Sequence, residues 1–292
     1  MSHTFLAVLF AIGAAICIAI GTVVRQRTAA VVPDDSIGAL GPITTLVHSP
    51  IWWLGTIVGI AGYALQAAAL GVGSLLLVQP LLVLSLLFAL PLGARFSGRT
   101  ISAREWLWAA ALTTSVAVLV VVGDPRPGQP RAETQHWIMI TLIGLPLIAL
   151  CLFGANRRTG SARALLLGIA GGSLFGVAAV LTKGVVHLVT LGPSAVLTSF
   201  EFYALVVVAA VATSVQQSAF QAGDLQASLP ATTIMEPVIA SLLGFVVLGE
   251  YLDADRTVAA ILVLAVVAMI AATVALARNA ADTAVSVPQK VR

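Results

Sequence analysis

The sequence predicts an all-α polytopic membrane protein with about nine transmembrane helices, arranged as two inverted four-helix repeats that flank a central span. Of the 292 residues, 59% are hydrophobic and 9% are charged, whereas a soluble domain has about 25% charged residues. Apolar runs of about 20 residues, the length that crosses a bilayer, recur along the chain. The two halves also share a sequence pattern. A β-barrel would instead show short segments of alternating hydrophobicity.

The apolar runs define the expected spans, whose ends are uncertain by a few residues. They lie at 4–24, 51–71, 74–93, 106–123, 137–154, 164–183, 195–215, 225–249 and 257–277. The stretch 28–50 contains Pro33, Pro42 and two adjacent aspartates, which makes a tenth span there a poor fit. We expect a short interfacial helix over 36–48 instead, followed by Trp52 and Trp53 at the membrane boundary.

The basic residues predict the orientation of these spans. The N-terminus and the loops after spans 2, 4, 6 and 8 hold four of the 15 Lys and Arg residues, and the opposite loops and the C-terminus hold the other eleven. The positive-inside rule therefore places the N-terminus outside and the C-terminus in the cytoplasm. Arginine strongly outnumbers lysine, and alanine and valine are abundant. This composition is typical of a high-GC bacterial genome, so we expect a bacterial cytoplasmic (inner) membrane protein.

An internal repeat relates the two halves of the chain. "LQAAALGVGSLLLVQP" at 65–80 aligns with "VQQSAFQAGDLQASLP" at 215–230, and "SLLFALPLG" at 85–93 aligns with "SLLGFVVLG" at 241–249. A single span between two four-span repeats would insert the second repeat upside down, a pattern found in secondary transporters. The domain organisation expected from this is a first repeat over 1–123, a central span with its loops over 124–163, a second repeat over 164–278 and a cytoplasmic tail over 279–292.

At these residues the sequence resembles the EamA-like group of the drug/metabolite transporter superfamily. Ala219, Pro237, Gly249 and Glu250 of "SAFQAGDLQASLPATTIMEPVIASLLGFVVLGE" (218–250) fit the family pattern. The first half departs from it, with Ala94 and Arg95 where an acid is usual. The nine-span plan is more similar to the NIPA-like branch, which is associated with magnesium transport. The resemblance implies a ten-helix-type inverted-repeat fold and carrier activity, without indicating a substrate.

Glu236 is the most informative polar residue, because it lies near the middle of an apolar span and precedes Pro237. Ionisable residues at this depth are costly and commonly functional. Glu236 could bind a proton or cation, with Pro237 freeing the carbonyl of residue 233. Alternatively, it is a protonated packing residue. Its counterpart in the first half is Gln79 beside Pro80, an uncharged amide.

Lys183 and Glu201 are the oppositely charged residues expected in the outer halves of neighbouring spans. They could form a structural ion pair. Alternatively, Lys183 could bind an anionic substrate group while Glu201 gates or protonates. Arg25, near the inner end of the first span, could reach the interface by snorkelling.

The remaining candidates are amides, tyrosines and prolines inside the spans. They are Gln66, Gln79, Gln216, Tyr63 and Tyr203 for substrate or ion binding, and Pro80, Pro230 and Pro237 as helix breaks. The amides could equally brace helices, and the tyrosines could be lipid-boundary aromatics. We interpret Glu250 as structural. We interpret "GIAGGSLFG" (168–176) as a helix-packing segment, because it lacks the Lys-Ser/Thr ending of a phosphate loop.

The sequence contains no nucleotide-binding motif, metal-ligand cluster or nucleophile–base arrangement, so we expect neither a primary pump nor an enzyme, and no cofactor. The leading hypothesis is a proton-coupled exporter of a small polar or amphiphilic metabolite or drug that works by alternating access. A magnesium or other divalent-cation transporter and a flippase for a lipid-linked intermediate are alternatives. The expected partners are a small-molecule substrate, a proton or cation and membrane lipids, without nucleic acid. A homodimer is left open.

Overall fold

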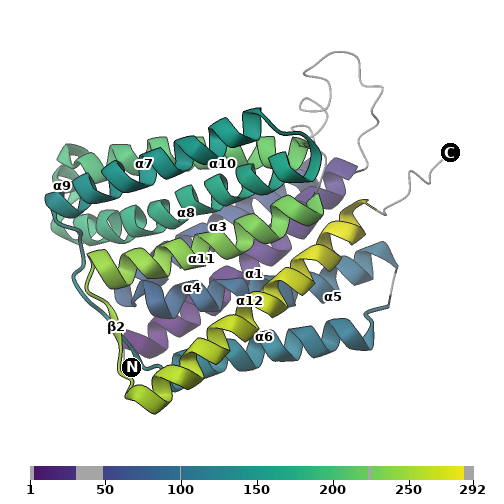
Figure 1. The fold of residues 1–292 in the computed structure, drawn as a ribbon, viewed down its shortest axis with the longest axis horizontal. Coiled ribbons are helices and arrows are strands. Elements are labelled where there is room, and N and C mark those ends of the chain that lie inside the picture. Colours follow the sequence, from purple (N-terminus) through teal and green to yellow (C-terminus); the bar gives the residue numbers. More distant parts are fainter. Residues whose placement is uncertain (1–2, 31–48, 99, 223–224, 286–292) are drawn as a thin grey trace.

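A computed structural model describes residues 3–30, 49–98, 100–222 and 225–285. Except for a ribbon of two short strands, all its regular elements are helices (Figure 1). In chain order they are α1 (His3–Ala30), α3 (Pro50–Val72), α4 (Leu75–Val83), α5 (Ser85–Ser97), α6 (Ala103–Val121), β1 (Pro125–Arg126), α7 (Thr134–Asn156), α8 (Gly160–Leu191), α9 (Pro193–Thr198), α10 (Phe200–Gln221), α11 (Leu225–Val247), β2 (Tyr251–Leu252) and α12 (Arg256–Val285).

Nine segments of the described chain are long and apolar enough to cross a membrane, which agrees with the predicted all-α polytopic class. The third of these spans consists of α4 and α5 together. The sixth differs most from the prediction, because α8 has 32 residues and a length of about 48 Å. The predicted interfacial helix at 36–48 lies outside the described residues.

The proline positions do not break their helices, so this prediction is wrong. Pro80 lies inside α4, and both Pro230 and Pro237 lie inside the continuous helix α11. A proline in a membrane helix is tolerated where neighbouring helices and Ser or Thr side chains support the backbone. Between the two prolines, the Thr232 hydroxyl donates to the carbonyl of Ser228 at 3.0 Å and to that of Gly168 in α8 at 3.3 Å, which holds α11 against α8. The third span is interrupted at Leu84 instead, where the helix tightens and the Leu84 amide donates to the Leu81 carbonyl at 3.2 Å.

A row of glycines brings α8 into close contact with α11, as the sequence predicts. A Cβ atom at Gly168 or Gly176 would lie 2.8 Å from atoms of α11, and one at Gly172 would lie 2.7 Å from the Thr232 carbonyl oxygen. The spacing of four residues keeps these glycines on one face of α8. This contact fixes the position of α11, which carries Glu236.

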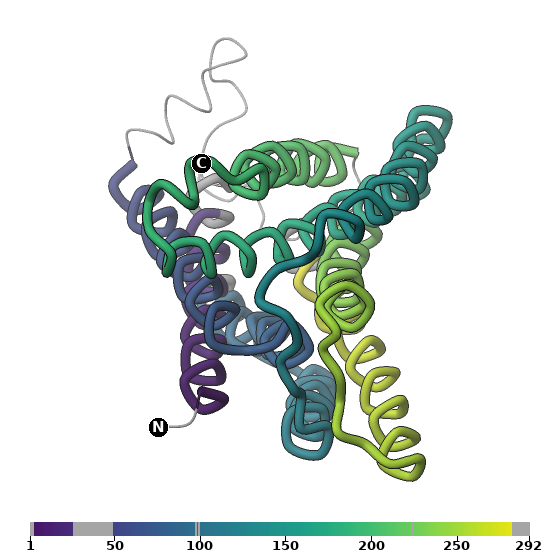
Figure 2. Tube along the Cα trace, turned by 90° about the vertical axis from the view of Figure 1, so that its left-hand side faces the viewer, coloured from purple at the N-terminus to yellow at the C-terminus, as the bar shows by residue number. Residues whose placement is uncertain are grey.

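The helices run along one another and leave two distinct ends (Figure 1). At one end β1 pairs antiparallel with β2, Pro125 opposite Leu252 and Arg126 opposite Tyr251. We call it the ribbon end; it also holds the α3–α4 turn and α9. The opposite end, which holds the α7–α8 turn, is called the far end. Viewed from the ribbon end, α11 lies between α8 and α12 (Figure 2).

The buried apolar core fills the space between α1, α4, α6, α11 and α12, mostly with alanine, leucine and valine side chains. By contrast, α7 and α10 leave most of their side chains exposed at the edge of the bundle. Exposed apolar side chains on peripheral helices are expected for a protein surrounded by lipid. The polar residues that the sequence singles out can therefore be divided into those near the centre and those at the edge.

Candidate functional site

Glu236 is the twelfth residue of the 23-residue helix α11, so its carboxylate lies near the middle of a membrane span. The residue is half-buried. Within the described part of the chain, Glu236 has no hydrogen-bond or ion-pair partner. An ionisable group at this depth without a partner is energetically unfavourable and commonly has a function.

Tyr63 lies close enough to both Glu236 and Arg25 for their charges to act on its hydroxyl group. Tyr63 belongs to α3 and is 55% exposed. Arg25, from α1, donates to the carbonyl of Gly21 at 3.1 Å. Its guanidinium group passes over Gly59, where a Cβ atom would lie 3.6 Å from Nη2. Tyr63 thus lies within electrostatic range of an acidic side chain from α11 and a basic side chain from α1.

Two amides lie between this region and the ribbon end. Gln66 is three residues after Tyr63, hence on the same face of α3, and is buried. Gln79 of α4 is 1% exposed, and its Nε2 has no hydrogen-bond partner among the described residues. Leu75, one turn earlier in α4, lies against Gly244 of α11, so Gln79 faces the same helix one turn deeper. A buried amide donor without a partner costs about 1–3 kcal/mol.

A buried ion pair lies at the ribbon end. Lys183 Nζ is 2.5 Å from Glu250 Oε1, and the two side chains are 7% and 0% exposed. Lys183 also donates to the carbonyl of Gly73 at 2.9 Å. The Glu250 carboxylate accepts hydrogen bonds from the amides of Leu75 and Leu76 at 2.9 and 3.0 Å. It thereby caps the first turn of α4, where the helix dipole stabilises an anion.

Two glycines allow Glu250 to reach this position. Gly249 adopts φ +64°, in the left-handed region that favours glycine, and ends α11. The Glu250 amide then donates to the carbonyl of Gly244 at 3.0 Å. A Cβ atom at Gly244 would lie 2.7 Å from Glu250 Oε2, so the carboxylate occupies space that a larger residue would fill. This geometry agrees with the structural role expected for Glu250.

Glu201 pairs with Arg131, so the predicted pair of Lys183 and Glu201 is wrong. The Arg131 guanidinium binds both carboxylate oxygens, with Nη2 distances of 2.7 and 2.8 Å. The sequence places Glu201 seven residues into a span, but α10 begins at Phe200 and Glu201 is its second residue. The interposed α9 accounts for this shift. Glu201 therefore lies at the ribbon end, where the loop that carries Arg131 reaches it.

Tyr203 and Gln216 are not brought to Glu236. The Tyr203 hydroxyl donates to the carbonyl of Leu197 at 2.9 Å, at the ribbon end of α10. Gln216 lies where α10 passes α8, and a Cβ atom at Gly171 would be 3.4 Å from its backbone nitrogen. Within the described ranges, neither side chain forms a hydrogen bond or ion pair with Glu236. No three His, Cys, Asp or Glu side chains of the described residues are grouped as metal ligands.

Sequence reasoning missed the connection between Glu250, Lys183 and the start of α4. A signal was present in "GVGSLLLVQP" (71–80), where a helix begins directly at the edge of the membrane. The first amides of such a helix need acceptors that the helix does not supply. Ser74 satisfies one, because its hydroxyl accepts from the Leu77 amide at 3.1 Å. Glu250 satisfies two more from a position 174 residues or more away.

The chain is 41% identical over 280 residues to an uncharacterized protein of Corynebacterium glutamicum. The match covers 96% of this chain and 97% of that protein. No family model matches the chain, and no solved structure shows a significant match. The resemblance to the drug/metabolite transporter superfamily therefore stays a prediction.

Proposed function

This chain belongs to the same family as the Corynebacterium glutamicum protein, and we propose that it is a secondary active transporter. The proposed substrate is a small polar or amphiphilic metabolite or drug, which the protein exports from a bacterial cell in exchange for protons. The single observation that carries this proposal is Glu236, a half-buried carboxylate in the middle of a span without a partner among the described residues. Groups of this kind mark proton relays and substrate pathways in transporters.

A series of polar groups along the bundle supports a transport pathway. It begins with Arg25 and leads past Tyr63 and Glu236 to the free amide of Gln79. It ends at the buried pair of Lys183 and Glu250. Arg25, Tyr63 and Gln79 belong to α1, α3 and α4 of the first half. Glu236 belongs to α11 of the second half. The proposed site thus lies between the two halves of the chain, as in inverted-repeat transporters.

In the proposed cycle, the structure corresponds to a state that is closed at the ribbon end. Lys183 and Glu250 join the second half to Gly73, Leu75 and Leu76 of the first half. Opening this end would separate them. The charge bias of the loops assigns the ribbon end to the outside and the far end to the cytoplasm.

The packing of the helices is consistent with the proposed inverted repeat. In that repeat α1 corresponds to α8, α3 to α10, α4 with α5 to α11, and α6 to α12. Helix α1 packs against α3 as α8 packs against α10, and α1 packs against α4 and α5 as α8 packs against α11. The symmetry would exchange α4 with α11 and α6 with α12, and the two helices of each of these pairs pack against each other.

Proteoliposomes filled with the small-molecule fraction of a bacterial extract test this function for every solute in the extract at once. An acidic exterior should drive a few solutes out faster than from protein-free liposomes, as mass spectrometry of the lumen would reveal. Glu236→Gln, which mimics a permanently protonated carboxyl group, should lower the gradient-driven efflux by roughly tenfold or more. It should retain exchange at equal pH, because that step needs no net proton movement.

Glu133→Gln is the matched control, since Glu133 is an exposed carboxylate at the ribbon end and should leave efflux unchanged. Gradient-driven efflux that survives Glu236→Gln would overturn proton coupling through this residue. Selective loss of Mg²⁺ from the lumen, with no organic solute moving, would favour the divalent-cation alternative. Transfer of a labelled lipid between leaflets without solute efflux would favour the flippase.

A further inference from the structure

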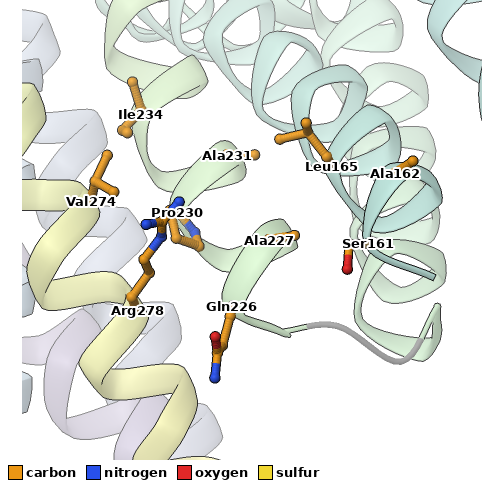
Figure 3. Close-up of a pocket in the computed structure, with 10 residues that line it drawn as sticks. All are labelled: Ser161, Ala162, Leu165, Gln226, Ala227, Pro230, Ala231, Ile234, Val274 and Arg278. Carbon is orange, nitrogen blue, oxygen red and sulfur yellow. The ribbon is translucent and has the colours of Figure 1, made fainter.

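A groove at the far end of the molecule lies apart from the proposed pathway. It has a volume of about 330 Å³ and is formed by the start of α8, the start of α11 and the end of α12 (Figure 3). Its walls include Ser161, Leu165, Pro230, Ile234, Val274 and Arg278.

The groove opens on the outer surface of the bundle. Ile234 and Glu236 are two residues apart in α11, which places their side chains about 200° apart around the helix. The groove and the proposed transport site therefore occupy opposite faces of α11. Because α11 lies between α8 and α12 at the edge of the bundle (Figure 2), the groove faces the surrounding membrane.

One cation projects over walls that are mostly apolar, with Ser161 and Gln226 as the other polar residues of the lining. Figure 3 shows the Arg278 side chain extending from α12 toward Pro230 of α11. Arg278 forms no hydrogen bond or ion pair within the described part of the chain. Leu165, Ile234 and Val274 supply the larger apolar side chains of the groove. The first turn of α8, which contains Ser161, adds the positive end of a helix dipole.

We propose that this groove binds an anionic phospholipid from the membrane leaflet at the far end. The phosphate group accepts hydrogen bonds from the Arg278 guanidinium, whose fixed donors match phosphate geometry. The upper parts of the acyl chains lie along Leu165, Ile234 and Val274. A basic groove between helices on the cytoplasmic side is a recognised kind of headgroup site. The proposal does not depend on the transport function.

The position of the groove favours a lipid over a free anion. A soluble phosphate would gain nothing from the apolar walls, whereas a lipid buries its chains on them. Arg278 lies in the last turn before the end of the ninth span, Arg256–Ala281, the depth of lipid headgroups. Its charge is not needed to balance another group among the described residues, so a lipid phosphate would be its counter-ion.

Native mass spectrometry of the full-length protein, released from nanodiscs of equal phosphatidylglycerol and phosphatidylcholine, measures this selectivity. The wild type should retain one phosphatidylglycerol in preference to phosphatidylcholine by at least about fivefold, the ratio expected for one arginine near an anionic lipid. Arg278→Gln should reduce the ratio to about one, and Arg278→Lys should preserve part of it. Ala162→Trp, which fills the groove from α8, should prevent retention of either lipid.

Arg95→Gln is the matched control. Arg95 is an exposed arginine in the last turn of α5, which also lies at the far end of the molecule but outside the groove. It should keep the wild-type ratio. Equal retention of both lipids by the wild type, or an unchanged ratio in Arg278→Gln, would overturn the proposal. Displacement of the phospholipid by millimolar inorganic phosphate would also overturn it, in favour of a small-anion site.

Discussion

At the scale of single residues, the partners of Lys183 explain how two charges are accommodated inside an apolar bundle. The ammonium group meets a carboxylate and a carbonyl, and the carboxylate also accepts two backbone amides. Desolvation of such a pair is unfavourable, and only complete hydrogen bonding compensates for it. Removal of one partner should therefore be more harmful than removal of both.

Lys183→Met should destabilise the protein by about 3–5 kcal/mol, because it leaves the buried Glu250 carboxylate without its counter-ion. The double change Lys183→Met with Glu250→Gln should recover most of the loss, since the glutamine carbonyl can still accept an amide of α4. Lys183→Met with Glu201→Gln should not recover it, because Glu201 pairs with Arg131. Thermal unfolding in nanodiscs measures all three. Rescue by Glu201→Gln rather than by Glu250→Gln would refute this pairing.

At the scale of elements, the contact between α8 and α11 depends on residues without side chains. Gly172 is enclosed by the Thr232 carbonyl and the Met235 Cβ atom, at 2.7 and 2.8 Å from the position of an added Cβ. A methyl group here would separate the helices or move α11, which carries Glu236.

Gly172→Ala should therefore destabilise the protein by about 1–3 kcal/mol, the usual cost of overpacking. It should also reduce gradient-driven efflux. Gly144→Ala is the control, because nothing lies within 4 Å of an added Cβ atom in the middle of α7. That variant should be as stable as the wild type or slightly more stable, owing to the better helix propensity of alanine. Equal stability of the two variants in thermal unfolding would contradict the packing argument.

The sequence is sufficient to predict the spans and the glycine contact because both depend on local patterns. Long apolar runs define a membrane helix, and "GIAGGSLFG" (168–176) places glycines on one helix face. Partners of charged residues depend on tertiary contacts instead. The sequence alone predicts Glu201 deeper in the membrane because Gly192, which separates α8 from α9, and Ser199, which separates α9 from α10, lie in an apolar run. Lys183 and Glu201 do lie near the same depth, since a Cβ atom at Gly184 would be 3.9 Å from Glu201 Oε1, but Lys183 pairs with Glu250 and Glu201 pairs with Arg131.

At the scale of the whole molecule, the ribbon end must separate if the protein works by alternating access. Helices α3 and α8 approach closely there. A Cβ atom at Gly71 would lie 3.8 Å from the Cβ atom of Val186, which matches the usual separation in a disulfide. The two positions belong to different halves of the chain, so a covalent bond between them would hold the ribbon end closed.

Gly71→Cys with Val186→Cys, in a background with Cys17→Ala and Cys151→Ala, should form this disulfide on oxidation. Gradient-driven efflux should then fall by roughly tenfold or more, and reductant should restore it. Each single cysteine variant serves as a control and should be insensitive to oxidation. Full efflux from the oxidised double variant would mean that the ribbon end stays closed throughout transport.

If the protein is a transporter in the proposed state, Glu236 lies on a pathway that is closed at the ribbon end and reached from the far end. Glu236→Cys, in the same cysteine-free background, can be treated with a membrane-impermeant thiol reagent in inside-out and right-side-out vesicles. The far end faces the reagent in inside-out vesicles according to the charge bias. We predict modification there at least about tenfold faster than in right-side-out vesicles, because the buried Lys183–Glu250 pair and the partly exposed Arg131–Glu201 pair close the other end. If the reagent modifies the introduced cysteine from neither side, Glu236 is a packing residue and does not lie on a transport pathway.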